Sequence, residues 1–520
     1  MWDSTLTEKW FILLKGQLLF TGRGFMGKYI ASYDIGTSGV KIALLDLDGN
    51  VKGIATASYA LITPAPGWAE QNPLDHWNAV CSVTKEAVKR SGIEPQDVIS
   101  VVFNTQWKGI IPIDKEGNVL HNAIIWLDGR GGKQAEIMNR RLGRPGFLCE
   151  RDYWPRLMWV KEERPEIYEK TETFLEVNSF LRYKATGCKS VDLTNDFIHS
   201  YDGDIQKLYT EIVEAAELDP DKFPPMALPT DKTGELTKEG AEALGLCEGT
   251  PVFAGSGDIP AIAIGSGCAG FGKGHIYLGS SGWLCFVYPK RRNEIGELTL
   301  SLYVGKEMSL YAQQSIGMSL NWAIDQFYHT EKEQLGGKIY DLINQEVSQT
   351  EPGCRGLIAT PWVYGERPPL SGNAGCVYFN ARNWHDRRYM MRAMMEAVCY
   401  SLNWKMELYE NQTGQRPASI RCVGGGSLSD PWMQAMADIL NITVEVPKNP
   451  QHAGAVGGAY CALIGLGLVK DFSEADEKIF PDRVFTPRAE YREMYQKQFE
   501  AFKQIFPRMS DLFDDLSQNE

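Results

Sequence analysis

The sequence lacks the features that mark several classes of protein. It contains no C-x-x-C pair, and its eleven cysteines are odd in number and dispersed along 520 residues. This spacing argues against zinc ligation and a disulfide framework, and it predicts a reducing, cytoplasmic location. Basic residues are too few for a nucleic-acid surface, because 66 acidic against 53 basic residues give a net charge of −13. We therefore expect no nucleic-acid partner.

Long hydrophobic runs are also missing. The one segment that resembles a targeting sequence, residues 10–20, is interrupted by Lys15, has no basic region before it and no small-residue cleavage site after it. We expect no signal peptide, no membrane span and no membrane partner. Fold-like patterning begins at Tyr29. We interpret residues 1–28 as an N-terminal extension that need not be native, and we hypothesise that Met26 is the natural start.

The length of the chain favours two domains, because a single hydrophobic core does not extend over so many residues. Strands predicted between residues 29 and 60 lead into a helix, and the same order of elements returns after residue 274, where a helix is expected over residues 333–347. We assign residues 29–283 to an N-terminal domain and residues 284–520 to a C-terminal domain with a helical tail. The expected fold class is α/β with two related halves.

A short motif occurs twice, as YDIGTSG at residues 33–39 and YLGSSG at residues 277–282. Each is an apolar strand that runs into a turn of glycine and hydroxyl-bearing residues, where backbone N–H groups are unpaired and a bulky anion has room. Both turns are predicted phosphate cradles, and two of them indicate that two halves hold one polyphosphate from opposite sides. The cradle residues are Gly36, Thr37, Ser38, Gly279, Ser280, Ser281 and Gly282.

Asp34 lies near the end of the first of these strands. A carboxylate there would face a cleft and hold Mg²⁺, directly or through water, because this ion prefers hard oxygen ligands. The alternative is an aspartate that initiates the turn by bonding its own backbone. The neighbouring Thr37, Ser38 and Lys41 favour the metal and phosphate interpretation.

Asp258 follows the run Gly255-Ser256-Gly257 and precedes Pro260. We interpret it as a general base that accepts the proton of a hydroxyl during phosphoryl transfer. The alternative is a helix N-cap with proline in the first turn. That alternative explains the aspartate and the proline, but it does not explain the small residues that clear room before them.

A third glycine-rich turn, Gly424 to Gly426 with Ser427, follows a predicted strand and precedes a helix that opens at Asp430. Bare backbone of this kind admits a flat adenine and its ribose. The alternative is a tight strand-to-helix turn, which a lone G-G-G run does not exclude.

The ordered set YDIGTSGVK, GWAEQNP, WLDGR, GSGD, YLGSSGW and VGGGSLSDPWMQAMAD resembles the FGGY family of carbohydrate kinases, and most of all its xylulose-kinase branch, from Tyr29 to about Leu468. The resemblance implies two ribonuclease-H-like domains of the actin/hexokinase/heat-shock-70 type, with ATP and sugar bound in a cleft between them. It also implies ATP as co-substrate, Mg²⁺ as cofactor and phosphorylation of a sugar, polyol or sugar-acid hydroxyl.

The same resemblance gives individual residues a role. Asp34 falls on the aspartate associated with Mg²⁺, and Asp258 falls on the catalytic base of a G-G-G-D motif whose middle glycine is replaced here by Ser256. The two cradles fall on the family's phosphate loops, and Gly424 to Gly426 fall on its adenosine motif. YWPRLMW at residues 153–159 is similar to a family signature in which Arg156 replaces a lysine.

The segment that corresponds to the sugar-binding segment of the family departs from the family pattern. Gln106 is kept, but Trp107 and Lys108 match neither the xylulose-kinase nor the glycerol-kinase version. We expect Trp107 to form an apolar wall and Lys108 to donate to hydroxyls or pair with a carboxylate; the alternative is a core tryptophan and a solvated lysine. Asp128 is a candidate ligand of a sugar hydroxyl, and Arg130 is equally well the structural partner of a nearby acid.

These features favour a sugar kinase over two other kinds of protein. A regulator that keeps the fold without catalysis would be expected to have lost a cradle or Asp258, and a chaperone-like ATPase would need a polypeptide-binding domain. A ketopentose such as xylulose is the expected acceptor, with polyols and sugar acids as open alternatives. A homodimer is compatible with the sequence.

Overall fold

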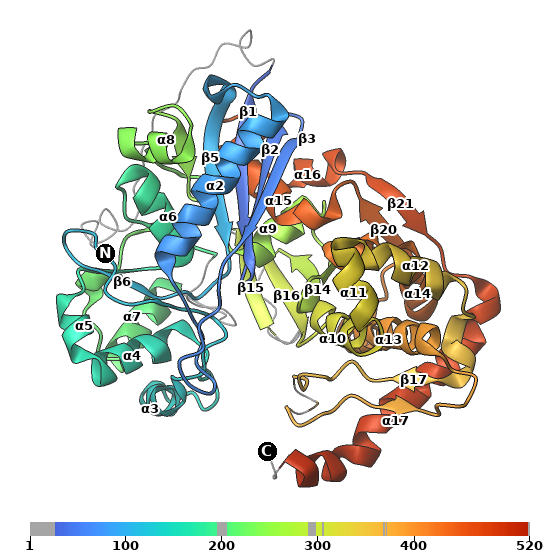
Figure 1. Cartoon of the computed structure of the whole chain (residues 1–520). Helices are drawn as coiled ribbons and strands as arrows, with labels where there is room; N and C mark the ends of the chain where they lie inside the picture. Colours follow the sequence, from blue (N-terminus) through green and yellow to red (C-terminus); the bar gives the residue numbers. More distant parts are fainter. Residues whose placement is uncertain are drawn as a thin grey trace.

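The computed structural model describes residues 27–194, 205–289, 298–303, 306–367, 370 and 372–517. Most of the predicted N-terminal extension, with Met26, lies outside these residues. Figure 1 shows two lobes, each built on its own sheet, with helices on the outer faces and two short helices between the sheets. Within the described residues, no helix has both the length and the apolar character that a membrane span requires.

The first lobe is built on a six-stranded sheet of order β11-β12-β5-β1-β2-β3. Three strands form an antiparallel meander, β5 runs parallel to β1, and β12 runs parallel to β5. The central strand β1 is buried along almost its whole length because helices cover both of its faces. The bounds are β1 (Tyr29–Ile35), β2 (Gly39–Asp46), β3 (Val51–Ser58), β5 (Val98–Thr105), β11 (Lys232–Glu235) and β12 (Pro251–Phe253).

Helix α2 (Pro73–Ser91) covers one face of this sheet, and its first residues are those typical of a helix start. The side chain of Asn72 accepts from the backbone N–H of Leu74, and Pro73 takes the first helical position. A subdomain of short strands and helices extends the lobe. Its elements are β4 (Glu70–Gln71), β6 (Ile111–Ile113), β7 (Ala123–Ile124), β8 (Thr173–Leu175), β9 (Val191–Asp192), β10 (Met226–Ala227), α3 (Gly132–Leu142), α4 (Tyr153–Glu163), α5 (Pro165–Lys170), α6 (Val177–Thr186), α7 (Ile205–Ala215) and α8 (Lys238–Leu244).

The second lobe repeats the plan of the first in a seven-stranded sheet of order β15-β16-β14-β13-β19-β20-β21. Here four antiparallel neighbours, β15, β16, β14 and β13, are followed by β19 and β20, which run parallel to β13. The predicted doubling of an α/β unit is confirmed. The bounds are β13 (Gly274–Leu278), β14 (Gly282–Tyr288), β15 (Leu298–Tyr303), β16 (Lys306–Gln313), β19 (Ser419–Val423), β20 (Thr443–Pro447) and β21 (Pro481–Phe485).

Two sequence-based boundaries need correction. The strand β13 pairs within the second sheet, so the sheets divide the chain before Gly274 and not after residue 283. The single helix predicted over 333–347 is two helices, because Gly336 adopts a φ of +53° between them. The remaining elements are α10 (Gly317–Phe327), α11 (His329–Leu335), α12 (Ile339–Ser348), α13 (Arg387–Thr413), α14 (Asp430–Leu440), α16 (Ser473–Lys478), α17 (Arg492–Ser517), β17 (Ile358–Ala359) and β18 (Tyr378–Phe379).

Helices α9 (Asp258–Gly265) and α15 (Ala453–Gly465) cross between the two sheets (Figure 1). Helix α15 packs on β1 and β5 although it comes late in the chain, and α9 contacts β13 and β15 of the second sheet. Their backbones touch. A Cβ on Gly265 would lie 1.8 Å from the carbonyl oxygen of Ala453, and one on Gly457 would lie 1.8 Å from that of Ala261. Both positions therefore require glycine, because a larger side chain would clash with the backbone of the other helix.

We predict that Gly457→Ala lowers the thermal unfolding temperature by several degrees, because overpacking against backbone costs roughly 1–3 kcal/mol or more. Gly337→Ala is the matched control, since no atom lies within 4 Å of its Cβ position and its φ is not positive. Differential scanning calorimetry of both variants tests this expectation. Equal unfolding temperatures for the two variants would contradict the packing described here.

Candidate active site

The first predicted cradle is the turn between β1 and β2. The N–H of Gly36 donates to the carbonyl of Gly39 at 3.0 Å, and the hydroxyl of Tyr59 donates to the carbonyls of both glycines. Ser38 at the tip is exposed, whereas Gly36 and Thr37 are half-buried. The turn is thus held from behind by Tyr59 while its tip faces solvent.

Asp34 lies beside this turn, buried except for 7% of its surface. The ammonium of Lys41 lies 3.5 Å from its Oδ2, and the pKa of this lysine is raised by the negative charge of Asp34. The first turn of α15 also reaches the carboxylate, because a Cβ on Gly454 would lie 2.8 Å from Cγ of Asp34. A cation and the first turn of a helix therefore both lie beside this carboxylate.

The second predicted cradle, between β13 and β14, is held by the start of α10. The carbonyl of Gly279 accepts from the N–H of Gly317 at 2.9 Å, and the carbonyl of Ser280 accepts from the N–H groups of Ile316 and Met318. Ser280 is exposed and Ser281 is half-buried. The carbonyls of this turn are therefore satisfied on the inner side, and its hydroxyl groups lie at the surface.

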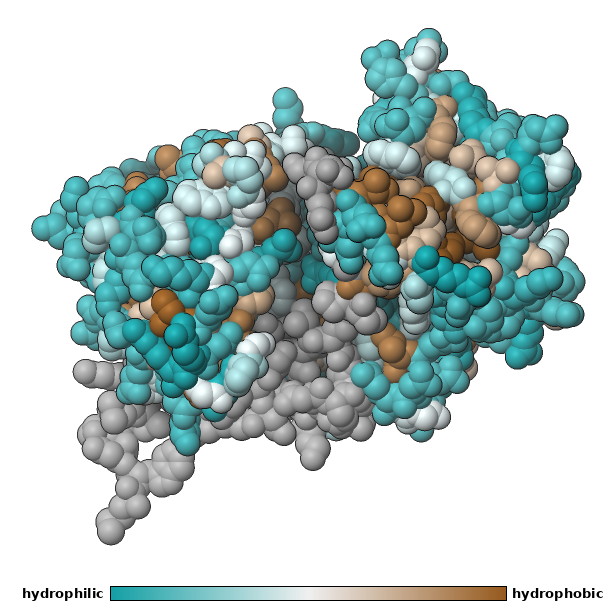
Figure 2. Space-filling view, turned by 90° about the horizontal axis from the view of Figure 1, so that it is seen from below, coloured by the Kyte–Doolittle hydropathy of each residue, from teal (hydrophilic) through white to brown (hydrophobic). Residues whose placement is uncertain are grey.

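The two cradles come close to each other across the lobes. Tyr277 stands just before the second cradle, and its hydroxyl lies within electrostatic reach of Lys41, Asp34 and Asp258 from the first lobe. Seen from below, a hollow separates the lobes, and hydrophobic residues gather on the second lobe beside it (Figure 2). The sequence named Tyr277 as part of the motif but gave no signal for a separate role.

Asp258 is the first residue of α9 and is half-buried. Its Oδ1 accepts from the N–H of Ile259 at 2.9 Å, but Gly257 occupies the N-cap position, so Asp258 does not make the side-chain cap of this helix. Burial, with a further contribution from the negative charge of Asp34, raises the pKa of Asp258 to about 7. A carboxyl with this pKa holds and releases a proton near neutral pH, which the structural alternative alone does not require.

The third glycine turn lies against the second cradle. A Cβ on Gly424, whose φ is +94°, would lie 2.6 Å from the carbonyl oxygen of Leu278, the last residue of β13. The N–H of Gly424 donates to the carbonyl of Pro450 at 2.9 Å, and Ser427 Oγ donates to the carbonyl of Gly424 at 2.7 Å. Gly425 is exposed, with no atom within 4 Å of its Cβ position. This turn therefore presents bare backbone at the surface.

The predicted sugar segment is tied to the first cradle by hydrogen bonds. Thr37 Oγ1 accepts from the indole N–H of Trp126 at 2.9 Å and donates to Gln106 Oε1 at 3.2 Å. Gln106 Nε2 donates to Gln71 Oε1 at 2.6 Å, and Gln71 Nε2 donates to the carbonyl of Thr37 at 2.6 Å. Gln106 is 1% exposed. Its amide thus holds the cradle in place, a role that sequence reasoning missed.

Lys108 also has an internal partner. Its ammonium donates to Asp152 Oδ1 at 2.6 Å and lies 4.3 Å from the ring centre of Trp107, and its backbone has a φ of +57°. Arg156 fixes this backbone, because its guanidinium donates to the carbonyl of Lys108 at 2.6 Å. Lys108 is buried, so it is neither a solvated lysine nor a cation that is free to pair with a ligand. Trp107 is half-buried and is the accessible member of the segment.

Asp128 is inaccessible, and its two oxygens accept from the guanidinium of Arg130 at 2.8 and 2.7 Å. Arg130 also donates to Glu70 Oε1 at 2.7 Å and lies between the rings of Trp68 and Trp159. This geometry corresponds to the interpretation of Arg130 as the structural partner of a nearby acid. For Asp128 the expected contact with a sugar hydroxyl needs correction, since the ion pair already uses both oxygens.

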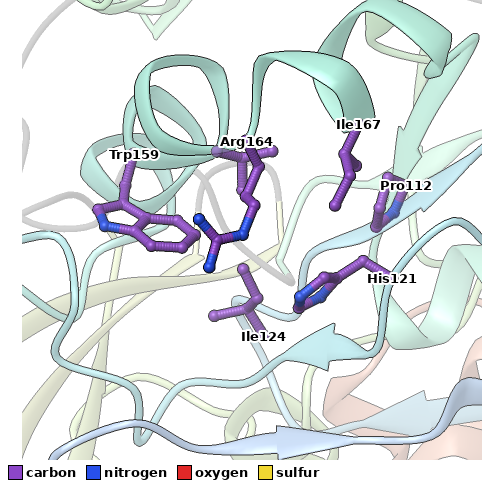
Figure 3. Close-up of a pocket in the computed structure, with 7 residues that line it drawn as sticks. Pro112, His121, Ile124, Trp159, Arg164 and Ile167 are labelled. Atoms are coloured by element: carbon purple, nitrogen blue, oxygen red, sulfur yellow. The ribbon is translucent and has the colours of Figure 1, made fainter. Parts of the chain in front are cut away.

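A small pocket opens in the subdomain of the first lobe, away from these loops (Figure 3). In the close-up, Arg164 projects between Trp159 on one side and Ile124 and His121 on the other. None of the predicted site residues lines it. We assign it no part in the site.

The donor set suits a magnesium ion carried by phosphates. Asp34 supplies one buried carboxylate, Asp258 lies within its electrostatic reach, and both bring hard oxygen atoms. The described residues contain no cluster of three side chains that would hold a metal by themselves. Mg²⁺ commonly uses one or two carboxylates together with waters and substrate phosphates, so the residues present fit this ion.

Comparisons with known proteins identify the family of this chain. The family model of the FGGY carbohydrate kinase N-terminal domain matches residues 29–265, and that of the C-terminal domain matches residues 292–466. A xylulose kinase of Bacillus subtilis is 29% identical over 93% of this chain and 98% of its own, and an L-xylulose/3-keto-L-gulonate kinase of Escherichia coli is 26% identical over 92% and 97%.

Solved structures show the same fold. A gluconate kinase of Lactobacillus acidophilus superposes with a TM-score of 0.79 at 21% identity, covering 94% of this chain and 99% of its own. A glycerol kinase of Plasmodium falciparum superposes with a TM-score of 0.74 at 18% identity, over 92% and 98%. With both family domains matched in order, the chain belongs to the FGGY family of carbohydrate kinases and is a sugar kinase, a phosphotransferase with an alcohol group as acceptor.

Proposed function

We propose that the enzyme transfers the γ-phosphoryl group of ATP to a hydroxyl of a neutral ketopentose such as xylulose, with Asp258 as the general base. One observation supports this proposal above the others: the half-buried carboxyl of Asp258, whose pKa is raised to about 7, lies within electrostatic reach of Asp34 and of Tyr277, the residue that precedes the second cradle. Relatives named xylulose kinase support the choice of acceptor.

In this mechanism the two cradles and Lys41 bind the phosphates of ATP, and Gly424 to Ser427 bind the adenosine. Asp258 accepts the proton of the acceptor hydroxyl while the oxygen of that hydroxyl bonds to the γ-phosphorus. At the same time the bond between the γ-phosphorus and the β-γ bridging oxygen breaks, and ADP leaves with that oxygen. Approach of the lobes would exclude water, which otherwise competes with the sugar for the phosphoryl group.

A magnesium ion, held by Asp34 directly or through water, would neutralise charge on the phosphates. Lys41 reinforces this role by adding a fixed positive charge 3.5 Å from the same carboxylate.

The acceptor is proposed to be neutral because the charge of Lys108, the cation predicted for the sugar segment, is already balanced by a carboxylate of the protein. Lys108 makes a buried ion pair with Asp152, and a second carboxylate on the substrate would have to compete with that partner. Trp107 is the accessible side chain beside this pair, and an indole face suits the carbon side of a sugar. Gln106, Lys108 and Asp128 then position the segment and do not contact the sugar through their side chains.

Replacing Asp258 by asparagine should lower kcat for the sugar by roughly 10²- to 10⁴-fold, because the base is lost while the shape of the side chain is kept. Asp231→Asn is the matched control, since burial also raises the pKa of Asp231 but it bonds the backbone of Leu228, outside the loops. A coupled assay of sugar-dependent ADP release, with unfolding temperatures for both variants, makes the measurement. A folded Asp258→Asn enzyme with near wild-type turnover would rule out the base.

The rate should also depend on pH in one direction. Because Asp258 must be deprotonated to accept a proton and its pKa is raised to about 7, kcat/KM for the sugar should fall tenfold per pH unit below that value and level off above it. Initial rates between pH 5.5 and 8.5 with saturating ATP and excess coupling enzymes test the profile. A flat profile down to pH 5.5 would contradict a base with a raised pKa.

A panel of acceptors tests the proposed substrate. We expect the highest kcat/KM for a ketopentose, a lower value for a pentitol and the lowest for an aldonic acid, whose carboxylate finds Lys108 already paired. Sugar-dependent ADP release at equal acceptor concentrations gives the ranking. An aldonic acid at the top of the ranking would overturn the proposal of a neutral acceptor.

A further inference from the structure

The side chain of Tyr277 lies directly against the backbone of the second cradle. Tyr277 lies one residue before the end of β13 and is half-buried, and its ring covers the backbone of the cradle. A Cβ on Gly279 would lie 2.4 Å from Cε1 of this ring and 2.7 Å from its hydroxyl oxygen. The glycine of the cradle is thus required in part by Tyr277, and the phenol lies directly against the turn.

The ring of Tyr277 is held by a second aromatic residue. Trp283 is its cross-strand neighbour on β14, and the two rings stack with centres 4.4 Å apart and planes 29° from parallel. The indole N–H of Trp283 donates to Nε2 of His275 at 3.0 Å. Burial lowers the pKa of His275 to about 3, so the imidazole is neutral and accepts this bond at neutral pH. Tyr277 is therefore positioned before any ligand binds.

Three charged groups of the other lobe interact electrostatically with the phenol. They are Lys41 of β2, Asp34 of β1 and Asp258 of α9, each within electrostatic reach of its hydroxyl. Burial and the two carboxylates raise the pKa of Tyr277 above its usual value although Lys41 acts in the opposite direction, so the hydroxyl stays protonated. Among the described residues the hydroxyl has no hydrogen-bond partner, and it is therefore a free donor at the meeting point of the two cradles.

We propose that the hydroxyl of Tyr277 donates a hydrogen bond to the terminal phosphoryl group of the nucleotide, adding a side-chain donor to the backbone donors of the second cradle. The inference rests on the proposed function, because it takes the cradles to be the phosphate site. A phosphoryl oxygen is the anionic acceptor expected beside Lys41, and hydrogen bonds to charged groups are among the stronger ones in proteins. Tyr277 thereby discriminates a triphosphate from a diphosphate.

The test is the ratio of ATP to ADP affinity. Isothermal titration of the full chain with Mg·ATP and Mg·ADP, in the absence of sugar, should show that Tyr277→Phe weakens ATP binding about tenfold or more and leaves ADP binding within about twofold. Tyr311→Phe is the matched control: it removes a phenol of the same sheet whose hydroxyl donates to Gln412, and it should change neither affinity.

Two substitutions of Trp283 test whether the position of the Tyr277 phenol matters in addition to its hydroxyl group. Trp283→Phe keeps an aromatic neighbour for Tyr277 and should retain most of the ATP preference, whereas Trp283→Ala should lose it if the stack orients the phenol. Unfolding temperatures of all variants show which of them are folded.

Each outcome bears on the proposal. An unchanged ratio in Tyr277→Phe, or an equal loss for ATP and ADP, would overturn it while leaving the kinase assignment in place. A wild-type chain that binds neither nucleotide would overturn the proposed phosphate site and this inference with it.

Discussion

The close crossing of α9 and α15 brings two helices that are far apart in the sequence into direct contact between the sheets. Because Gly265 and Gly457 carry no side chain, the two helices pack backbone to backbone between the sheets. In the same helix pair, the first turn of α15 lies against Asp34 and α9 begins at Asp258, so both carboxylates lie on or beside these two helices. A chain segment from the far end of the sequence thereby completes a site that begins at the first strand.

The electrostatics of the site follow from this crowding. Asp34 has Lys41 and a helix N-terminus beside it, whereas burial and the charge of Asp34 leave Asp258 with a raised pKa. Two carboxylates in different surroundings suit different tasks. The proposed division gives Asp34 the metal and Asp258 the proton, and Tyr277 joins them from the opposite lobe.

Much of this arrangement is predictable from the sequence, since local patterns carry it. The doubled motif predicted two glycine turns at equivalent places, and the alternation of strands and helices predicted the repeated sheet. The internal ion pairs of Lys108 and Asp128 were not predictable, because their partners Asp152 and Arg130 are recognised only in three dimensions. The same holds for the place of β13, which pairs with a strand far along the chain.

Phosphorus NMR of the products formed from ATP with and without xylulose gives the sharpest test of the proposed kinase reaction. That reaction should yield one sugar phosphate for each ADP, and almost no inorganic phosphate, when the sugar is present. Inorganic phosphate in place of sugar phosphate would contradict it, because it would make the enzyme an ATPase whose two cradles serve another purpose.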